Sequence, residues 1–314
     1  MKKHFSQTTF LAVIACLLWS SAFVGVKIGL KYHSPLQFAG LRFVISGLML
    51  IPLVFDFTRF RKEVSENFGY VCLIAFLQVI LQYSLFYLGL SLVPASISAM
   101  IVGSSPLFVA LVAHFFMAGD QMDWVKSISI LLGIVGVGVI TLGRDSLPSG
   151  AQIALTGVVL LIFSNLASGI TNVVVARKKQ TISPMVLTSS SLFMGGLSLF
   201  VISIPIEGFE LKVFPTEYFV ALGWLSFLSA AAITIWNTLL RRPGVKVSEL
   251  NIWKFLIPVS GAILSWLILP DESPDVVSVA GMMLIASALL ILQFSNRRQK
   301  ASASNPWPRI EVLN

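Results

Sequence analysis

The sequence has little charge. Only 11% of its 314 residues are Asp, Glu, Lys or Arg, whereas 56% are hydrophobic and the mean hydropathy is +0.88. Soluble globular proteins carry about 25% charged residues, so this chain has too little polar surface to cover a globule in water. Lipid must therefore be the solvent for most of the chain, which excludes the soluble classes of protein.

Residues that bind metals or act as nucleophiles are also scarce. The two cysteines, Cys16 and Cys72, lie in apolar runs without a spacing pattern, which gives a disulfide or a metal site little support. A membrane enzyme needs clustered His, Cys, Asp or Glu at membrane depth, but the three histidines, His4, His33 and His114, are far apart. The sequence has no nucleophile elbow and no Walker motif. We therefore expect no enzyme, no cofactor and no metal site.

Long apolar segments fill the chain instead. A bilayer core needs about 20 apolar residues per helix, and charged or Pro/Gly-rich breaks leave ten such segments. We predict membrane-spanning helices at about 8–30, 35–55, 69–91, 94–117, 123–142, 151–176, 184–206, 216–240, 248–269 and 274–294. Residues 1–7 and the polar, Pro-containing residues 295–314 are predicted to form cytoplasmic tails, the second of them disordered.

The basic residues indicate the orientation of these helices. With the N-terminus in the cytoplasm, sixteen Lys and Arg residues fall in inner segments, and only Lys31, Arg144 and Lys212 fall in outer ones. The positive-inside rule thus supports ten helices in the cytoplasmic (inner or plasma) membrane, with both termini cytoplasmic. The net charge of +8 is then a signal of topology, and no nucleic-acid partner is expected.

The two halves of the chain resemble each other. Four features recur at offsets of 148 to 152 residues: Ser34-Pro35 with Ser183-Pro184, Pro106 with Pro258, Asp120 with Glu272, and Gly133 with Gly281. Each half holds five predicted helices, an odd number, so the second half must cross the membrane in the opposite direction. We predict an all-α integral membrane protein with ten transmembrane helices, built as two inverted five-helix repeats, 8–142 and 151–294. Secondary transporters have this architecture, with the substrate site near the midplane between the repeats.

Several stretches resemble the drug/metabolite transporter superfamily, specifically its ten-helix EamA-type branch. They are "LLWSSAFVGVKIGL" at 17–30, "SPLQFAGLRF" at 34–43, "LVPASISAMIVGSSPLFVALVAHFFMAGD" at 92–120 and "VVVARKKQTISPMVLT" at 173–188. The chain departs from the family at Gly119-Asp120, where many members have Gly-Glu, and at "NIWKFLIP" (251–258). The resemblance covers residues 8–295 and implies an ATP-independent transporter of small organic solutes, often an exporter.

Polar side chains recur at helical spacing within several predicted spans. In lipid, polar atoms at membrane depth face other helices or a wet cavity. For each residue, a hydrogen bond between helices is the alternative to substrate contact, and Trp19 and Trp236 have the further alternative of an interfacial belt. The candidate substrate-binding residues are Trp19, Gln78, Gln82, Tyr83, Asn165, Ser168, Asn172, Trp236, Asn237, Asn251 and Lys254.

Two cations lie within predicted spans, where a charge costs roughly 2.5–3.5 kcal/mol. Lys254 lies about 9 Å inside the ninth helix and has an uncharged counterpart, Val102, so we expect it to bind a substrate anion or an internal partner. Its alternative is to extend toward the cytoplasm. Arg42 lies about 10 Å below the outer end at Pro35. For Arg42 we favour a structural tie to helix-end carbonyls or an outer-loop acid, which closes an outer gate, over substrate binding.

Other residues are expected to serve gating and packing. Pro106 and Pro258 interrupt corresponding helices, and matched interruptions point to a transporter's site and hinges. Lys27 continues the face of Trp19 and is assigned with Arg42 to gating or structure. The helices at 123–142 and 274–294 carry small residues and few polar ones, which favours peripheral packing or dimer contacts, so we expect a monomer or a weak homodimer through these two helices.

The predicted function is secondary transport of small organic metabolites, most simply export of amino acids or related solutes by alternating access. Two alternatives remain open: a permease for phosphorylated or nucleotide-linked anions, and a membrane receptor or scaffold. Proton-driven transporters usually keep an acid deep in the bundle, and no Asp or Glu lies in the middle of a predicted span. This absence favours facilitated diffusion or exchange over proton antiport.

Overall fold

The computed structural model describes residues 2–54, 56–117, 123–142, 151–177, 182–209, 213–245 and 247–303. These residues form helices joined by short connections, and no strand occurs among them. Seven helices are long and apolar enough to cross a membrane: Gln7–Leu30, Pro35–Leu53, Phe68–Leu92, Ala95–Phe116, Gln152–Arg177, Pro184–Glu207 and Thr216–Leu240. Three shorter apolar helices cover Trp124–Ile140, Trp253–Ile268 and Val276–Leu292.

The first half of the chain contains α1 (Lys2–Leu30), α2 (Pro35–Leu50), the 3₁₀ turn η1 (Ile51–Leu53), α3 (Phe57–Glu66), α4 (Phe68–Ile74), the π-helix η2 (Ala75–Tyr83), α5 (Ser84–Leu92), α6 (Ala95–Gly103), α7 (Ser105–Phe116) and α8 (Trp124–Leu142). The second half contains α9 (Ala151–Arg177), α10 (Pro184–Glu207), α11 (Thr216–Leu240), α12 (Val247–Asn251), the 3₁₀-helix η3 (Ile252–Phe255), α13 (Leu256–Ile268) and α14 (Val276–Ala303).

Several helix boundaries differ from the predicted ones. The helix starts expected at the two Ser-Pro pairs are confirmed, since α2 begins at Pro35 and α10 at Pro184. However, α1 begins at Lys2 and α14 continues to Ala303, so both predicted tails are partly helical, because the residues there are mostly good helix formers. The helix α3 was not predicted at all. Gly119 and Asp120 lie outside the described residues.

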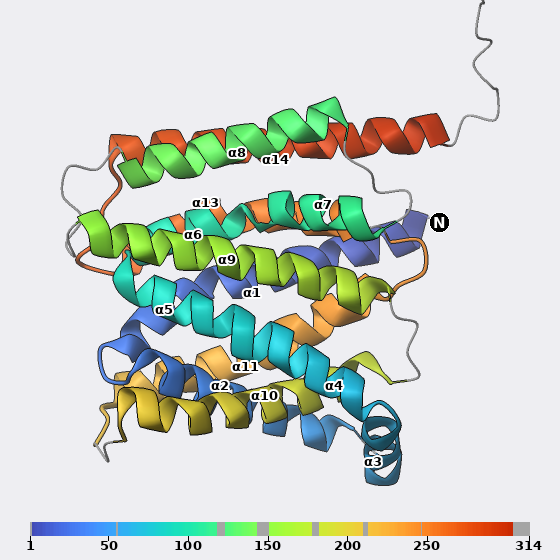
Figure 1. Cartoon of the computed structure of the whole chain (residues 1–314), viewed down its shortest axis with the longest axis vertical. Coiled ribbons are helices and arrows are strands. Elements are labelled where there is room, and N and C mark those ends of the chain that lie inside the picture. The colour runs from blue at the N-terminus through green and yellow to red at the C-terminus, as the bar shows by residue number, and fades with distance from the viewer. Residues whose placement is uncertain are drawn as a thin grey trace, which may run out of the picture.

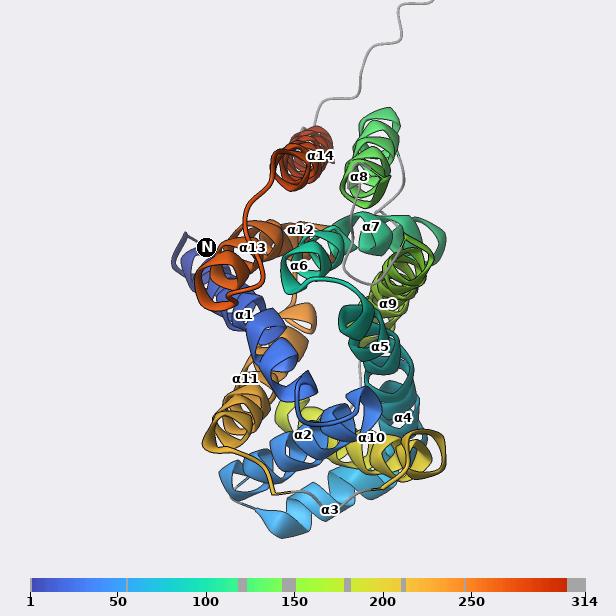
Figure 2. The same ribbon diagram turned by 90° about the vertical axis from the view of Figure 1, so that its left-hand side faces the viewer.

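Helices from both halves of the chain surround the centre of the molecule, and α8 and α14 stand apart from them. In Figure 2, α1, α2, α5, α6, α7, α9, α10, α11 and α13 form a closed ring, with α4 continuing α5. The helices α8 and α14 lie side by side outside the ring in both Figure 1 and Figure 2. Within the ring, α2 packs on α10 and α6 packs on α13.

Small residues allow the closest of these helix contacts. A Cβ added at Gly40 of α2 would lie 2.6 Å from the backbone nitrogen of Phe200 in α10, and one at Gly47 would lie 2.6 Å from that of Phe193. The glycines of the two outlying helices also face each other, because a Cβ at Gly281 would lie 2.9 Å from the Gly136 carbonyl oxygen. The small residues of α8 and α14 therefore pack these helices within one chain.

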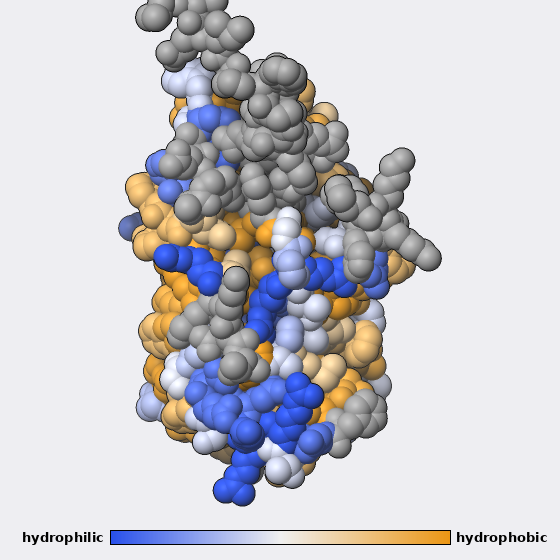
Figure 3. Space-filling view, turned by 90° about the vertical axis from the view of Figure 1, so that its right-hand side faces the viewer, coloured by the Kyte–Doolittle hydropathy of each residue, from blue (hydrophilic) through white to orange (hydrophobic). Residues whose placement is uncertain are grey.

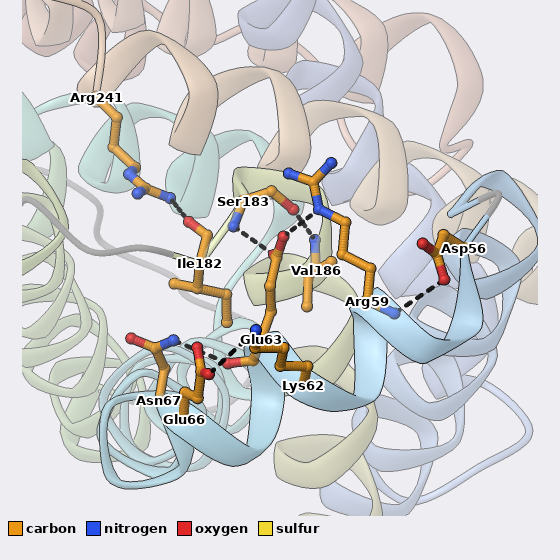
Figure 4. Close-up of polar contacts among 10 residues, drawn as sticks. All are labelled: Asp56, Arg59, Lys62, Glu63, Glu66, Asn67, Ile182, Ser183, Val186 and Arg241. Atoms are coloured by element: carbon orange, nitrogen blue, oxygen red, sulfur yellow. Dashed lines mark hydrogen bonds and ion pairs between the residues drawn. The ribbon is translucent and has the colours of Figure 1, made fainter.

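Three carboxylates hold the first turns of helices in the other half of the chain. Glu207, the last residue of α10, accepts hydrogen bonds from the Leu36 and Gln37 N–H groups at 2.9 and 3.0 Å. Glu272 accepts from the Ala95 and Ser96 N–H groups at 2.6 and 2.8 Å. Glu63 of α3 accepts from the Ser183 N–H group at 2.8 Å (Figure 4). Carboxylates at helix N-termini are stabilised by the free N–H groups and the helix dipole.

The two ends of the bundle differ in charge. One end, the acidic end, carries Glu207, Glu217, Asp271 and Glu272 beside the first turns of α2 and α6. The other end, the basic end, carries Arg61, Arg177, Arg241 and Arg242 beside α3 and the first turn of α10. Figure 3 views the end at which α3 lies, and hydrophilic side chains gather there between hydrophobic flanks.

Candidate functional site

A cavity lies in the middle of the ring. The space between its lining side chains that no atom fills is about 840 Å³, part of it open to solvent. Helices from both halves of the chain contribute to its walls. The lining residues are Trp19, Ala22, Phe23, Arg42, Gln78, Gln82, Tyr83, Phe86, Val102, Ser105, Ser164, Asn165, Ser168, Thr171, Asn172, Trp236, Asn237, Leu240, Lys254 and Ile257.

The structure brings together all the candidate substrate-binding residues except one. Asn251 does not line the cavity; it is fully buried and donates hydrogen bonds to Asn172 Oδ1 at 3.2 Å and to the Val247 carbonyl at 2.9 Å. Asn251 therefore supports a lining residue from behind. Arg42, which we expected to be structural, lines the cavity as well. Contact of any of these residues with a substrate stays a prediction.

Lys254 occupies the most distinctive place in the cavity. Its residue is 5% exposed, and its Nζ atom lies 4.9 Å from the ring centroid of Trp236 and 5.5 Å from that of Trp19. The two indoles pack edge to face, with centroids 5.1 Å apart. Cation–π contacts stabilise such an ammonium group. The side chain thus points between the indoles, and Lys254 has no ion pair with any carboxylate whose side chain the structure describes, a set that leaves out Glu249.

Hydrogen bonds fix the indole beneath Lys254. The Trp236 Nε1–H group donates to Asn172 Oδ1 at 2.8 Å, and the same oxygen accepts from Asn251 Nδ2. Asn172 in turn donates through Nδ2 to the Ser168 carbonyl at 2.7 Å. This polar stripe of α9 therefore sets the position of Trp236, and part of its hydrogen-bonding capacity is already used within the protein.

Two other amides on the cavity wall also have partners. Asn165 Nδ2 donates at 2.7 Å to the Ile101 carbonyl. This carbonyl lies in the last turn of α6, just before the break at Ser104 that separates α6 from α7. Asn237 Nδ2 donates at 3.0 Å to Thr188 Oγ1 of α10. These contacts fit the alternative that we left open for these residues, hydrogen bonding between helices.

The wall formed by the third predicted span has an unexpected geometry. Gln78, Gln82 and Tyr83 lie in the π-helix η2, not in a regular α-helix. Ser164 of α9 donates to the Gln82 carbonyl at 3.0 Å, which satisfies a backbone oxygen within this irregular stretch. Short π-helical segments are frequent at functional sites. No residue pattern of 75–83 signals a π-helix, so only the structure shows it.

Two buried polar atoms on the cavity wall have no hydrogen-bond partner. They are the Trp19 Nε1–H donor and the Gln78 Oε1 acceptor. An unmet polar atom in a buried place costs about 1–3 kcal/mol, and most such atoms in proteins are satisfied. Both atoms belong to residues that we selected as candidates from the sequence. A solute in the cavity can offer an acceptor to the Trp19 N–H group and a donor to the Gln78 side-chain oxygen.

Arg42 has different partners from those expected. Its Nε donates to Ser229 Oγ at 2.8 Å and to the Leu225 carbonyl at 3.2 Å, one terminal nitrogen donates to Ser229 Oγ at 2.6 Å, and the other donates to the Tyr87 hydroxyl at 2.6 Å. Among the described residues, neither an outer-loop acid nor a helix-end carbonyl takes part, so the expected partners are wrong, whereas the structural role expected of Arg42 stays a prediction. Arg42 is 1% exposed, so its charge is buried at a cost in free energy. The hydroxyl and mid-helix carbonyl partners offset this cost, as do three nearby aromatic rings, Phe43, Tyr83 and Tyr87.

The two prolines lie beside the helix breaks. Pro106 is in the first turn of α7, directly after the break at Ser104, and Pro258 is in the first turn of α13, directly after η3. A Cβ added at Gly103 would lie 2.2 Å from Pro258 Cδ, so the two interrupted helices meet at this point. Lys27 lies elsewhere, in a surface hollow at the acidic end that Asp271 and Glu272 also line.

Comparison with known proteins gives consistent results across the chain. The model of the EamA-like transporter family matches residues 7–142 and 155–294. The chain is 25% identical to an "Uncharacterized transporter YvbV" of Bacillus subtilis (strain 168), over 95% of each chain. It is 28% identical to a "Probable amino-acid metabolite efflux pump" of Escherichia coli (strain K12), over 93% of this chain and 96% of that one. A protein of the same printed name from Salmonella typhimurium is 26% identical, over 93% and 97%.

A solved crystal structure shares the fold. It has a TM-score of 0.68 and 19% sequence identity, and covers 93% of this chain and 98% of the other. Together with the apolar helices, the family match identifies an integral, multi-pass membrane protein. The chain belongs to the EamA-like transporter family, within the drug/metabolite transporter superfamily.

Proposed function

We propose that the protein is a secondary transporter that exports amino acids or related carboxylate-bearing solutes across the cytoplasmic membrane. The observation that carries this proposal is Lys254, whose ammonium group faces the cavity between two indoles and has no ion pair among the side chains that the structure describes. A buried cation strongly favours an anionic partner. The Trp19 donor and the Gln78 acceptor offer further hydrogen bonds to the same solute. Two relatives named as probable amino-acid metabolite efflux pumps favour this substrate class.

Ten membrane-spanning helices in two inverted repeats are part of the proposal. The helix packing supports it, because helices of the first half have counterparts in the second. The counterpart of α2 is α10, that of α6 with α7 is α12 with α13, and that of α8 is α14. Contacts between the two halves follow this pairing: α2 packs on α10, α8 on α14, α6 on α13 and α7 on α12, and α1 packs on α11 and α13 as α9 packs on α5 and α7. The carboxylates at the ends of the α2–α10 pair support it as well. Glu207 holds the start of α2 at one end, whereas Glu63 holds the start of α10 at the other.

Alternating access follows from this arrangement. At the acidic end, Glu207 and Glu272 tie the second half of the chain to α2 and α6 of the first. The cavity extends in the other direction as far as Leu240, the last residue of α11. With the basic end in the cytoplasm, the conformer is closed outward and its cavity lies toward the cytoplasm. Rocking of one repeat against the other then exposes the site to the outside.

The test is a thermal-shift screen of the purified protein against amino acids, amines and phosphorylated metabolites. Ligands that bind the folded state raise its Tm by mass action. We expect amino acids to raise the Tm of the wild type and of Lys62→Met, a surface control, but not of Lys254→Met. If amines raise the Tm of wild type and Lys254→Met equally, Lys254 is structural and the proposal fails.

Two outcomes of the same screen favour the alternatives. A larger shift with phosphorylated or nucleotide-linked compounds than with amino acids favours a permease for these anions, which the same cation also suits. A ligand that raises the Tm but shows no flux in liposomes favours a receptor.

The proposed oligomeric state is a monomer, or a weak homodimer that forms through the exposed faces of α8 and α14. Leu131, Ile134 and Met283 lie on these faces.

A further inference from the structure

The helix α3 is amphipathic and lies between two membrane-spanning segments. Its sequence FTRFRKEVSE places Phe57, Phe60 and Val64 on one stripe, at i, i+3 and i+7, and charged residues on the rest of its surface. The span Pro35–Leu53 ends just before α3, and the span Phe68–Leu92 begins just after it. The position of α3 along the chain therefore places it at the level of the bilayer surface, where amphipathic helices of this kind lie.

The apolar stripe of α3 forms one wall of a groove that faces outward. Phe57, Phe60, Arg61, Val64, Ser65 and Phe68 line it. Phe57 is 66% exposed and Phe68 is 55% exposed, although both are large hydrophobic side chains. Leu53, at the end of the preceding span, is also exposed, so the groove continues the apolar surface that faces lipid. An apolar groove at this depth fits an acyl chain better than it fits water.

One cation on α3 is left without an ion pair. Arg59 pairs with Glu63 at 2.8 Å and Lys62 approaches Glu66 at 3.9 Å, whereas Arg61 has no ion pair among the described residues and lines the groove itself. A guanidinium binds phosphate through two parallel hydrogen bonds, and basic residues at the membrane surface attract anionic lipid headgroups. We propose that this groove binds one anionic phospholipid, with the acyl chain against Phe57 and Phe68 and the phosphate on Arg61.

Bound lipid would act on the contact between α3 and α10. Figure 4 shows Glu63 pointing from α3 to the start of α10, where it accepts hydrogen bonds from the Ser183 N–H group and from Arg59. Arg241 donates to the neighbouring Ile182 carbonyl. A lipid that holds the outer face of α3 against the bilayer keeps Glu63 on its inner face in place. Anionic lipid thereby stabilises the link between the two halves at the basic end.

The experiment uses the full-length protein in detergent, titrated with dioleoyl phosphatidylglycerol, dioleoyl phosphatidylcholine or soluble glycerol 3-phosphate. Native mass spectrometry measures the bound lipid. We expect phosphatidylglycerol to bind the wild type more tightly than phosphatidylcholine. Arg61→Gln should weaken the binding of phosphatidylglycerol about fivefold, which is the factor for one basic residue at an anionic surface. The same variant should leave the binding of phosphatidylcholine unchanged. Arg177→Gln, which removes an exposed arginine elsewhere at the basic end, should change neither.

A second variant tests the apolar part of the groove. Phe57→Ser should weaken both lipids, because each inserts the same acyl chain, and Phe57 is exposed enough for the variant to fold. Equal phosphatidylglycerol affinity in wild type and Arg61→Gln would overturn the proposal, as would glycerol 3-phosphate displacing the lipid at equal concentration. Neither result bears on Lys254, so failure here is distinct from failure of the transport proposal.

Discussion

At the scale of single residues, Arg42 shows how this fold keeps a charge in an apolar interior. The guanidinium has no carboxylate partner among the described residues, and its donors instead reach Ser229 and Tyr87, on two different helices. A planar fork suits this arrangement, because it holds both partners without bending. Arg42 therefore ties α2 to α11 and α5 at the cavity wall, and it acts on the cavity mainly by positioning these helices.

Replacement of Arg42 by lysine tests this role. A single ammonium group keeps the charge but cannot serve Ser229 and Tyr87 in the same geometry, so we expect Arg42→Lys to lose about 1–3 kcal/mol of stability. The measurement is the Tm in detergent, with Arg177→Lys, an exposed site, as the control. An unchanged Tm together with full transport would show that the guanidinium geometry is not needed.

The charge of Glu63 gives a prediction about pH. Burial raises the pKa of this carboxyl, but hydrogen bonds from the Ser183 N–H group and from Arg59 outweigh it and hold the pKa below its ordinary value. Because the folded-state pKa is the lower one, the contribution of Glu63 to stability is present above about pH 4.5 and is lost as the pH falls through the folded-state pKa. Between about pH 6 and pH 3.5 the Tm of the wild type should therefore fall more than that of Glu63→Gln. Parallel Tm curves for the two proteins would contradict this assignment.

At the scale of elements, the close contact of α2 and α10 depends on glycine. A methyl group at Gly40 would meet the backbone of Phe200 at 2.6 to 2.8 Å, and backbone atoms cannot move aside as side chains can. We expect Gly40→Ala to cost about 1–3 kcal/mol. The matched control is Gly69→Ala in α4, where a Cβ meets nothing within 4 Å. If Gly40→Ala and Gly69→Ala unfold at the same temperature, then α2 and α10 can move apart without loss of stability.

The sequence predicted some elements and not others, for physical reasons. Long apolar runs and Ser-Pro pairs are local signals, so the apolar segments and the starts of α2 and α10 were predicted. Polar and aromatic residues at helical spacing, together with Lys254, likewise predicted ten of the twenty residues that line the cavity. The π-helix η2 and the partners of Arg42 depend on contacts with residues distant in sequence, such as Ser164 and Ser229, and α3 was missed because its charged residues indicated a loop.

At the scale of the whole molecule, the proposed alternating access assigns closure of the acidic end to two carboxylates, Glu207 and Glu272. Loss of a charged hydrogen bond of about 1.5 kcal/mol shifts a two-state equilibrium about tenfold. We therefore expect Glu272→Gln to populate the outward-open conformer. In a background without Cys16 and Cys72, a cysteine at Ala22, which lines the cavity, should then react faster with a membrane-impermeant maleimide added outside.

The control for this experiment is Glu217→Gln. Glu217 also lies at the acidic end, but its carboxylate accepts a hydrogen bond from the Tyr32 hydroxyl instead of capping a helix. Its labelling rate should match that of the parent. Equal rates for Glu272→Gln and Glu217→Gln would show that Glu272 does not hold the acidic end closed.

The most direct measurement of the central claim is flux of amino acids from proteoliposomes, compared with flux of their methyl esters. The esters keep the amine and the side chain but lack the carboxylate that Lys254 is proposed to bind. We predict that wild type transports one or more amino acids, that it does not transport the corresponding esters, and that Lys254→Met loses the amino-acid flux. Equal transport of acid and ester, or full flux through Lys254→Met, would contradict the account.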